Sequence, residues 1–271
     1  MLAVAPVTLY KITQSADPQA QPDLLAVEEP LEIRLGFGPA DNRQQRTVAV
    51  TMRTPGHDEE LALGFLFTEN ILEKPAQVVS VRHCVTDSEK KGNVLRVELR
   101  PDVLIDWQRL ERHSFTASSC GICGKTSIDA VQAVCQTPVV AGFQIAPELI
   151  HNLPEKLRET QRAFAHTGGL HAAALFDETG CLLLVREDIG RHNALDKLIG
   201  AAFWQGWLPL SRFGVLVSGR IGFELVQKSW MAGVPMLAAV GAPSSLAVEL
   251  AKGAGMTLLG FVRDNRFNQY S

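Results

Sequence analysis

The 271-residue sequence predicts an α/β fold, in which an α+β N-terminal part precedes a layered α/β C-terminal domain. Before residue 138, short segments alternate apolar and polar residues, which is typical of strands with one exposed face. After residue 138, short apolar segments alternate with amphipathic ones, which indicates layered strands and helices with much parallel pairing. With 46% hydrophobic and 20% charged residues, the composition is that of a globular chain.

We divide the chain into four parts. Residues 1–27 are rich in proline and polar residues and are expected to form a flexible, poorly ordered lead-in. An N-terminal α+β domain covers residues 28–113. A loop with two cysteines and the helix after it cover residues 114–137, and the C-terminal α/β domain covers residues 138–271.

The N-terminal domain is expected to contain four strands and two helices. Two alternating segments flank a cluster of Gly, Pro, Asp and Asn, which predicts a hairpin. Three acidic residues follow Pro55 and Gly56 and predict a helix start, because negative charge suits the positive end of the helix dipole. The predicted strands are 32–35, 47–52, 78–82 and 93–99, and the predicted helices begin at Asp58 and span 102–112.

The most reactive short segment carries Cys120 and Cys123, with glycines between and after them and Lys125 at its end. The glycines give the backbone freedom. Residues 126–134 have helical spacing, so the pair is expected just before a helix N-terminus, a position that favours reactive thiolates.

The C-terminal domain is expected to alternate strands and helices. A helix over 147–162 is predicted to break at Pro154, and a glycine-rich turn at 166–171 leads into a hairpin. The predicted strands are 172–176, 181–186, 214–217, 235–240 and 256–262, and the other predicted helices are 192–204, 223–232 and 244–254.

Polar loops follow four of these strands, at 187–193, 218–220, 241–245 and 263–266, and three of them bring arginine. In a parallel α/β sheet such loops meet at one edge, where helix N-termini favour anions. The sequence therefore predicts an anionic ligand at this edge. Neither a Walker loop nor a Gly-x-Gly-x-x-Gly fingerprint is present.

Composition narrows the function class. The net charge of −3 gives no overall field for nucleic acid, so no nucleic-acid partner is expected. No apolar run reaches the length of a membrane span and no export signal is seen, so we expect a cytoplasmic protein without a membrane contact. The odd number of five cysteines argues against a disulfide framework there.

The cysteine pair is compatible with three kinds of chemistry. Structural zinc needs four ligands, and no second ligand pair is present. His57 to Glu59 with the cysteines formally matches the zinc-deaminase pattern, but Ser119 replaces the usual proline. Thiol–disulfide exchange suits Cys-x-x-Cys before a helix, although the preceding segment is polar. Sulfur transfer needs an accessible thiolate on a loop. We predict no bound metal, and the residues alone do not separate the last two chemistries.

A series of blocks, in order along the chain, resembles the formate dehydrogenase accessory sulfurtransferase family, FdhD. The blocks are Arg53 to Gly56, Glu60 to Leu66, Cys120 to Gly124, Thr167 to Ala173, Glu187 to Lys197, Ser218 to Arg220, Glu224 to Lys228, Pro243 to Ala247 and Thr257 to Arg263. The resemblance does not depend on a single motif, because the blocks cover most of the chain.

The resemblance implies a sulfurtransferase that accepts sulfur from a cysteine desulfurase. It would pass the sulfur to the molybdenum cofactor, Mo-bis(molybdopterin guanine dinucleotide), before insertion into the catalytic subunit of formate dehydrogenase. By residue matching, Cys120 is the persulfide carrier and Cys123 its companion. The resemblance also implies a cytidine-deaminase-like C-terminal domain and a homodimer.

The anion edge and the resemblance together give a set of cofactor-binding residues, with GDP as the expected mimic of the guanine arm. Arginines are candidate phosphate contacts, and Asp188 or Asp264 is a candidate acceptor from a guanine amino group. The set is Phe261, Val262, Arg263, Asp264, Asn265, Arg266, Arg191, His192, Arg220, Thr167, Gly168, Gly169 and His171. The alternative is a chaperone that only binds and delivers the cofactor.

Overall fold

A computed structural model describes residues 3–14, 16–84, 92–105, 107, 139–140, 142–263 and 265–271. Cys120, Cys123 and the helix predicted at 126–134 lie outside the described residues. So do Asp264 and most of the helix predicted at 102–112.

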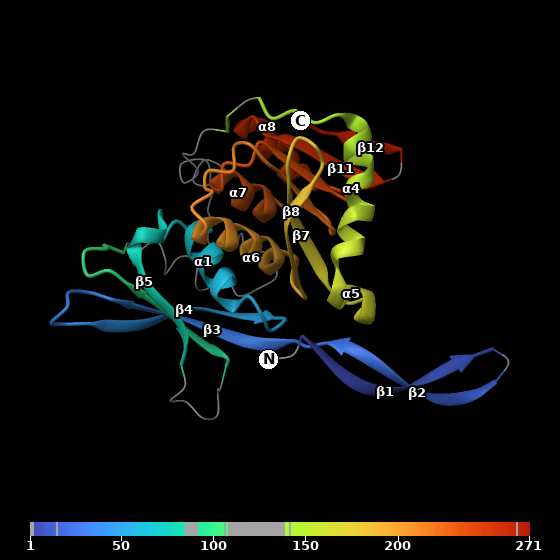
Figure 1. The fold of residues 1–271 in the computed structure, drawn as a ribbon, viewed down its shortest axis with the longest axis horizontal. Coiled ribbons are helices and arrows are strands. Elements are labelled where there is room, and N and C mark those ends of the chain that lie inside the picture. Colours follow the sequence, from blue (N-terminus) through green and yellow to red (C-terminus); the bar gives the residue numbers. More distant parts are fainter. Residues whose placement is uncertain are drawn as a thin grey trace.

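The first described residues form a two-stranded antiparallel ribbon that projects from the body of the molecule (Figure 1). Its strands are β1 (Val4–Thr13) and β2 (Ala16–Ala26). The prediction of a poorly ordered lead-in is therefore wrong. β-Branched and aromatic residues in β1 favour an extended chain. The prolines are tolerated because both strands of such a ribbon are edge strands, where a missing N–H can face solvent.

The N-terminal sheet has the strand order β4-β3-β6-β5. The four predicted strands are confirmed as β3 (Glu29–Phe37), β4 (Gln44–Arg53), β5 (Val78–His83) and β6 (Val94–Leu99). β3 and β6 are parallel, and the other pairs are antiparallel. Alternate residues of β3 and β6, including Leu31, Ile33 and Val97, are fully buried on the inner face.

Helix α1 (Asp58–Thr68) covers this inner face, and the short 3-10 helix η1 (Pro75–Gln77) precedes β5. The predicted start is confirmed, with three acidic residues in the first turn. Leu61 and Ile71 are buried, and Phe65 packs partly buried against the same core.

The C-terminal sheet has the order β12-β11-β10-β9-β7-β8. Its central strands β9 (Gly214–Val217), β10 (Met236–Ala239) and β11 (Thr257–Arg263) are parallel. β7 (His171–Phe176), β8 (Leu182–Asp188) and the unpredicted β12 (Arg266–Gln269) complete it by antiparallel pairing.

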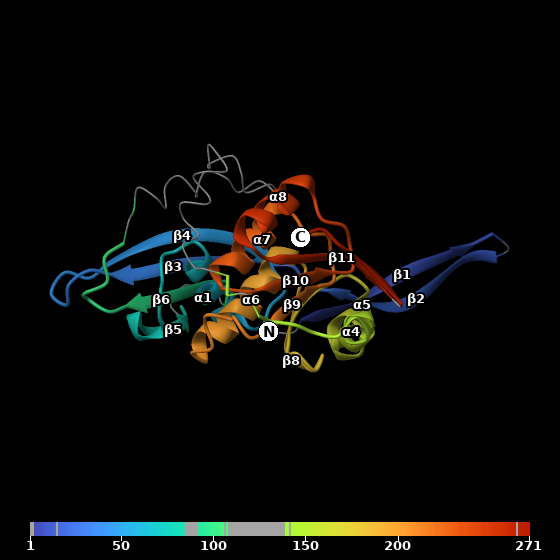
Figure 2. The same ribbon diagram turned by 90° about the horizontal axis from the view of Figure 1, so that it is seen from above.

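Helices cover both faces of this sheet. They are α4 (Pro147–Thr160), α5 (Arg162–Thr167), α6 (Arg191–Trp204), α7 (Phe223–Met231) and α8 (Ser245–Ala254). Side chains of α6, α7 and α8 pack on one face, with Ala173, Val215 and Leu237. Side chains of α4 pack on the other, with Ala172 and Leu216. Figure 2 shows α4 and α8 on opposite sides of β10 and β11. The α/β class is thus confirmed.

Helix α4 continues through Pro154, where a break was predicted. The proline removes one backbone donor, but Leu153 and Leu157 are buried on both sides of it and packing retains the helix. No helix among the described residues is long and apolar enough to cross a membrane.

The two sheets are joined by close packing of α1 on α6. A Cβ atom on Gly64 would overlap the carbonyl oxygen of Asp196, and one on Gly200 would overlap that of Glu60. The helix backbones therefore touch at this crossing, which only glycine permits.

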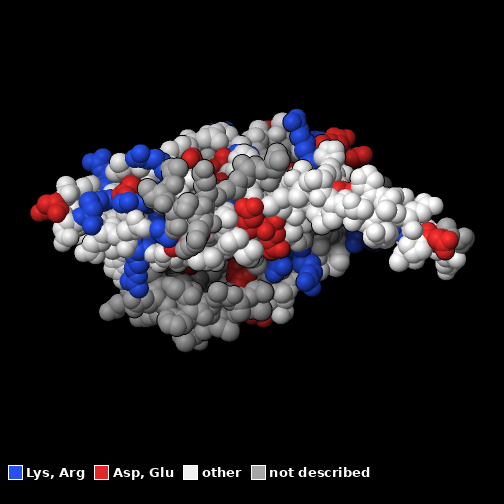
Figure 3. Space-filling view, turned by 90° about the horizontal axis from the view of Figure 1, so that it is seen from below, with Lys and Arg blue, Asp and Glu red and all other residues white. Residues whose placement is uncertain are grey.

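The outer face of the N-terminal sheet carries a row of arginines, and Lys and Arg side chains gather over this end of the molecule in Figure 3. Arg34, Arg96 and Arg82 are cross-strand neighbours in β3, β6 and β5. Like charges in such positions repel each other. Glu32 pairs with Arg34 and Glu98 with Arg96, so the repulsion is offset within the face.

Candidate functional site

The four polar loops follow strands that end at the same edge of the C-terminal sheet. β9, β10 and β11 are parallel, and β8 runs with them because β8 and β9 are both antiparallel to β7. The sequence-based prediction that these four loops meet at one edge of the sheet is therefore confirmed. His171, at the start of β7, lies at this edge too.

His171 lies beside Gly219 and Arg191. A Cβ atom added to Gly219 would lie 3.2 Å from His171 Nδ1 and 3.9 Å from Arg191 Cβ, so both side chains lie on the same side of Gly219. Burial lowers the pKa of His171, and the charges of Arg191 and His192 lower it further against the opposing effect of Asp188. The imidazole is therefore neutral at neutral pH and can both donate and accept a hydrogen bond.

Arg191 and His192 are the first two residues of α6. Arg191 Nε is buried and has no hydrogen-bond partner among the described residues. His192 Nε2 lies 2.7 Å from Glu224 Oε2. Burial would raise the pKa of Glu224, but the contact with His192 and the charges of Lys228 and Arg191 together outweigh it and the pKa is lowered. An unpaired guanidinium N–H at a helix N-terminus indicates a place for an anionic acceptor.

The next two loops continue the edge. Gly241 N donates to Gly219 O over 3.2 Å, and Phe261 N donates to Gly241 O over 3.1 Å. A Cβ atom on Gly241 would lie 2.8 Å from Gly219 O, so the loops need glycine to come this close. Arg220 stands exposed between them.

In the predicted stretch 261–266, residues 261–263 end β11, Arg266 begins β12, and Asn265 lies in a turn before β12. Phe261 has φ 54° and Asn265 has φ 64°, both in the left-handed region. Arg263 and Arg266 face each other across the turn and are exposed. Val262 is fully buried in the core, so its side chain cannot contact a ligand and only its backbone remains available. The predicted binding role of Val262 is therefore limited to its backbone and stays a prediction.

Thr167, Gly168 and Gly169 form the turn that leads into β7. Thr167 Oγ1 donates to Ala163 O over 2.9 Å, and Gly168 ends α5 with φ 65°. Gly169 lies next to Ala26 at the end of the ribbon. These residues position the start of β7, and their binding role stays a prediction.

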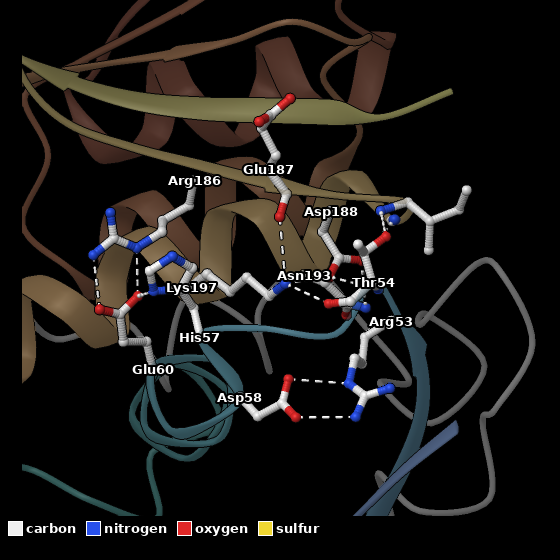
Figure 4. Close-up of polar contacts among 12 residues, drawn as sticks. Arg53, Thr54, His57, Asp58, Glu60, Arg186, Glu187, Asp188, Asn193 and Lys197 are labelled. Carbon is white, nitrogen blue, oxygen red and sulfur yellow. Dashed lines mark hydrogen bonds and ion pairs between the residues drawn. The ribbon is translucent and has the colours of Figure 1, made fainter. Parts of the chain in front are cut away.

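Asp188 is the most heavily hydrogen-bonded carboxylate near the edge (Figure 4). Its side chain is fully buried, and it accepts from Thr54 N at 3.1 Å, Gly190 N at 2.8 Å and Asn193 Nδ2 at 3.1 Å. Lys197 Nζ lies 2.7 Å from Asp188 Oδ2. The suggestion that Asp188 accepts from a guanine amino group is therefore wrong. We call Thr54, Asp188, Asn193 and Lys197 the polar clasp.

The sequence interpretation missed Lys197, which is 1% exposed and donates to Thr54 O at 2.9 Å and Glu187 O at 3.3 Å. A signal was present: Lys197 stands in an apolar helix just before Leu198 and Ile199. A lysine at such a position needs a buried partner.

Two further ion pairs lie near the junction of the two parts. Arg53, which is fully buried, binds Asp58 with two hydrogen bonds of 3.0 Å. Arg186 of β8 binds Glu60 of α1, with 2.7 Å between Nη2 and Oε1. Burial would raise the pKa of Glu60, but Arg186 and His57 outweigh it and lower the pKa to about 2.

These pairs involve Asp58 and Glu60, two of the three acidic residues at the helix start that matched the deaminase pattern. His57 Nδ1 lies 3.2 Å from Glu60 Oε2, and Asp58 is held by Arg53. Within the described part of the chain, no group of three or more His, Cys, Asp or Glu side chains is placed to hold a metal ion.

Comparison with known proteins assigns the chain to a family. A model of the FdhD/NarQ family matches residues 26–271. The chain belongs to the FdhD/NarQ family. The family model covers both sheets and begins at the end of β2, so most of the ribbon precedes it.

Two relatives in the FdhD/NarQ family show the extent of the likeness. The sulfur carrier protein FdhD of Streptomyces coelicolor is 50% identical over 256 residues, covering 93% of this chain and 88% of the relative. That of Sulfurisphaera tokodaii is 41% identical over 271 residues, covering 100% and 98%.

A crystal structure described as a formate dehydrogenase accessory protein from Desulfotalea psychrophila superimposes with a TM-score of 0.75. It is 22% identical and covers 100% of this chain and 97% of the other. The fold of this FdhD/NarQ chain is therefore shared along its whole length. The finer likeness to a deaminase fold stays a prediction.

Proposed function

We propose that the chain is a sulfurtransferase that serves formate dehydrogenase as a sulfur carrier. The observation that carries the proposal is its 50% identity, over 93% of its length, to the sulfur carrier protein FdhD of Streptomyces coelicolor. The sequence supplies the required thiols in Cys120 and Cys123.

We assign the persulfide to Cys120. Its thiolate attacks the outer sulfur of a persulfide on a cysteine desulfurase, the donor's sulfur–sulfur bond breaks, and the donor cysteine leaves as a thiolate. The new sulfur–sulfur bond is on Cys120. Attack by the Cys123 thiolate on the inner sulfur then releases hydrosulfide and forms a Cys120–Cys123 disulfide, which a cellular dithiol reduces.

The proposed acceptor is Mo-bis(molybdopterin guanine dinucleotide), bound as a substrate. Its arms carry pyrophosphate groups, which arginine pairs with well. The loops at the sheet edge fit such an anion, because Arg191 Nε is buried without a partner among the described residues and Arg220, Arg263 and Arg266 are exposed. Neutral His171 beside Arg191 adds a polar contact.

The proposal includes three protein contacts and a place in the cell. A cysteine desulfurase donates the sulfur, and the catalytic subunit of formate dehydrogenase receives the cofactor. A second copy of the chain completes a homodimer, and the cytoplasm is the compartment in which donor and acceptor would meet.

Mass spectrometry of the intact protein tests the carrier role. After incubation with a cysteine desulfurase and cysteine, we expect a mass increase of one sulfur atom, located on Cys120 by peptide mapping and lost on treatment with a dithiol. Iodoacetamide-blocked protein is the control. If no adduct forms although the protein binds the cofactor, the chain is a delivery chaperone and not a sulfurtransferase.

Calorimetry with GDP tests the substrate site. We expect GDP to bind, and Arg191→Ala and Arg266→Ala each to weaken binding by roughly 10- to 150-fold, since a charge-assisted hydrogen bond contributes about 1.5–3 kcal/mol. Arg82→Ala, on the outer face of the N-terminal sheet, is the matched control and should bind as wild type does. Absence of GDP binding to wild type would contradict this part of the proposal.

A further inference from the structure

The polar clasp ties the end of β4 to the turn between β8 and α6. Thr54 N donates to Asp188 Oδ2 over 3.1 Å, and Ile189 N donates to Thr54 Oγ1 over 3.2 Å. Asn193 Nδ2 donates to Met52 O over 2.7 Å. The segment around β4 therefore binds this turn on both sides of Gly190, through the backbone of Ile189 and the side chains of Asp188 and Asn193.

The charged pair at the centre of the clasp is deeply buried. Asp188 is 0% and Lys197 1% exposed, and both have several hydrogen-bond partners. A buried ion pair often adds little stability compared with apolar residues, because both charges lose their hydration. In some proteins a buried ion pair instead holds the surrounding residues in one specific conformation. The clasp is suited to such a role because its contacts come from both sheets.

Arg191 directly follows Gly190, so it is the first residue after the turn that the clasp contacts. Arg191 and His171 lie beside the same glycine, Gly219, and Arg191 Nε is buried without a partner among the described residues. Asp188, by contrast, has no room for a ligand, since its oxygens already accept from four groups. The clasp and the anion edge are thus adjacent but separate.

We propose that the polar clasp is a positioning device that aims Arg191 at the anionic ligand, with Thr54 and Asp188 acting through Arg191 and not on the ligand. This inference rests on the proposed function for its ligand. Contacts from the N-terminal sheet then set the affinity of a site in the C-terminal sheet.

The first test uses Thr54, because its side chain contributes only Oγ1 to the clasp. Thr54→Val keeps the shape and leaves Ile189 N–H without an acceptor, so GDP affinity should fall about fivefold, the effect of one hydrogen bond. Thr54→Ser restores the oxygen and should restore the affinity. Glu60→Gln weakens another contact between α1 and β8 and should leave GDP affinity unchanged.

A double-mutant cycle separates positioning from a general structural effect. If Thr54 acts through Arg191, adding Thr54→Val to Arg191→Ala should cause no further loss of GDP affinity. Additive losses would overturn the proposal, as would an equal loss in Glu60→Gln.

The second test needs no ligand. Arg191, His192 and Asp188 are the charged groups that act on His171, and Arg191 lowers its pKa. In Thr54→Val, a displaced Arg191 should let the pKa of His171 rise, as measured by NMR titration of the imidazole, and Arg191→Ala should do the same. If only Arg191→Ala moves it, the clasp does not position Arg191. This readout decides the inference even if GDP fails to bind and the proposed substrate is wrong.

Discussion

Cys120→Ala is expected to abolish sulfur loading and to reduce formate dehydrogenase maturation to background in cells that lack the wild-type protein. The loss should be on the order of 10⁴-fold in transfer rate, because a covalent nucleophile cannot be replaced by alanine. Sulfur loading is measured with labelled cysteine and a desulfurase, and maturation by formate oxidation in extracts.

Binding measurements show whether the loss is specific. Cys120→Ala should still bind GDP with wild-type affinity and unfold at the wild-type temperature, since the proposed GDP site lies on another segment. Cys181→Ala, which removes an exposed cysteine on the far side of the β7–β8 hairpin from the edge loops, should load sulfur normally. Normal loading of Cys120→Ala would remove that residue from the mechanism.

Asp196→Ala is expected to destabilise the protein by about 3–5 kcal/mol, because it removes the nearest counter-charge of the buried Lys228. Lys228 Nζ lies 2.9 Å from each Asp196 oxygen and 2.9 Å from Thr68 Oγ1, where α1, α6 and α7 meet. Burial alone would lower the pKa of Lys228, but the carboxylates of Asp196 and Glu69 outweigh it and raise the pKa. Loss of Asp196 removes the largest of the effects that raise this pKa, so the Lys228 amine is left buried without its nearest counter-charge.

Urea denaturation measures the effect, with Asp196→Leu combined with Lys228→Met as the matched control. The double variant removes both charges and should lose much less stability than the single one, since no buried charge remains. Equal losses in the two proteins would show that packing and not charge explains the cost.

Local patterns predicted the elements of the two sheets well because strand alternation and helix spacing report directly on burial. Because parallel strands end on the same side of a sheet, these strand predictions also placed the loops of Arg191 and Arg220 at one edge. The ribbon was missed because Pro18 and Pro22 were interpreted without regard to edge position.

The polar clasp could not be predicted in the same way. Its contacts join residues 134 positions apart, such as Thr54 and Asp188, and no local period encodes such a pairing. A carboxylate next to an arginine-rich turn looks like a ligand contact until its burial is known. Asp188 was misassigned for this reason. The burial of the Val262 side chain was not foreseen either, because a motif does not show which side chains face the core.

The glycine crossing of α1 and α6 has a consequence for how the chain can be divided. Phe203 of α6 belongs to the core under the N-terminal sheet, and Phe67 of α1 packs against the cores of both parts. A cut near residue 138 would therefore leave each fragment with an open apolar face and a groove shaped for the other's backbone. The halves recognised in the sequence are two sheets of one folding unit, and neither is expected to be a transferable module.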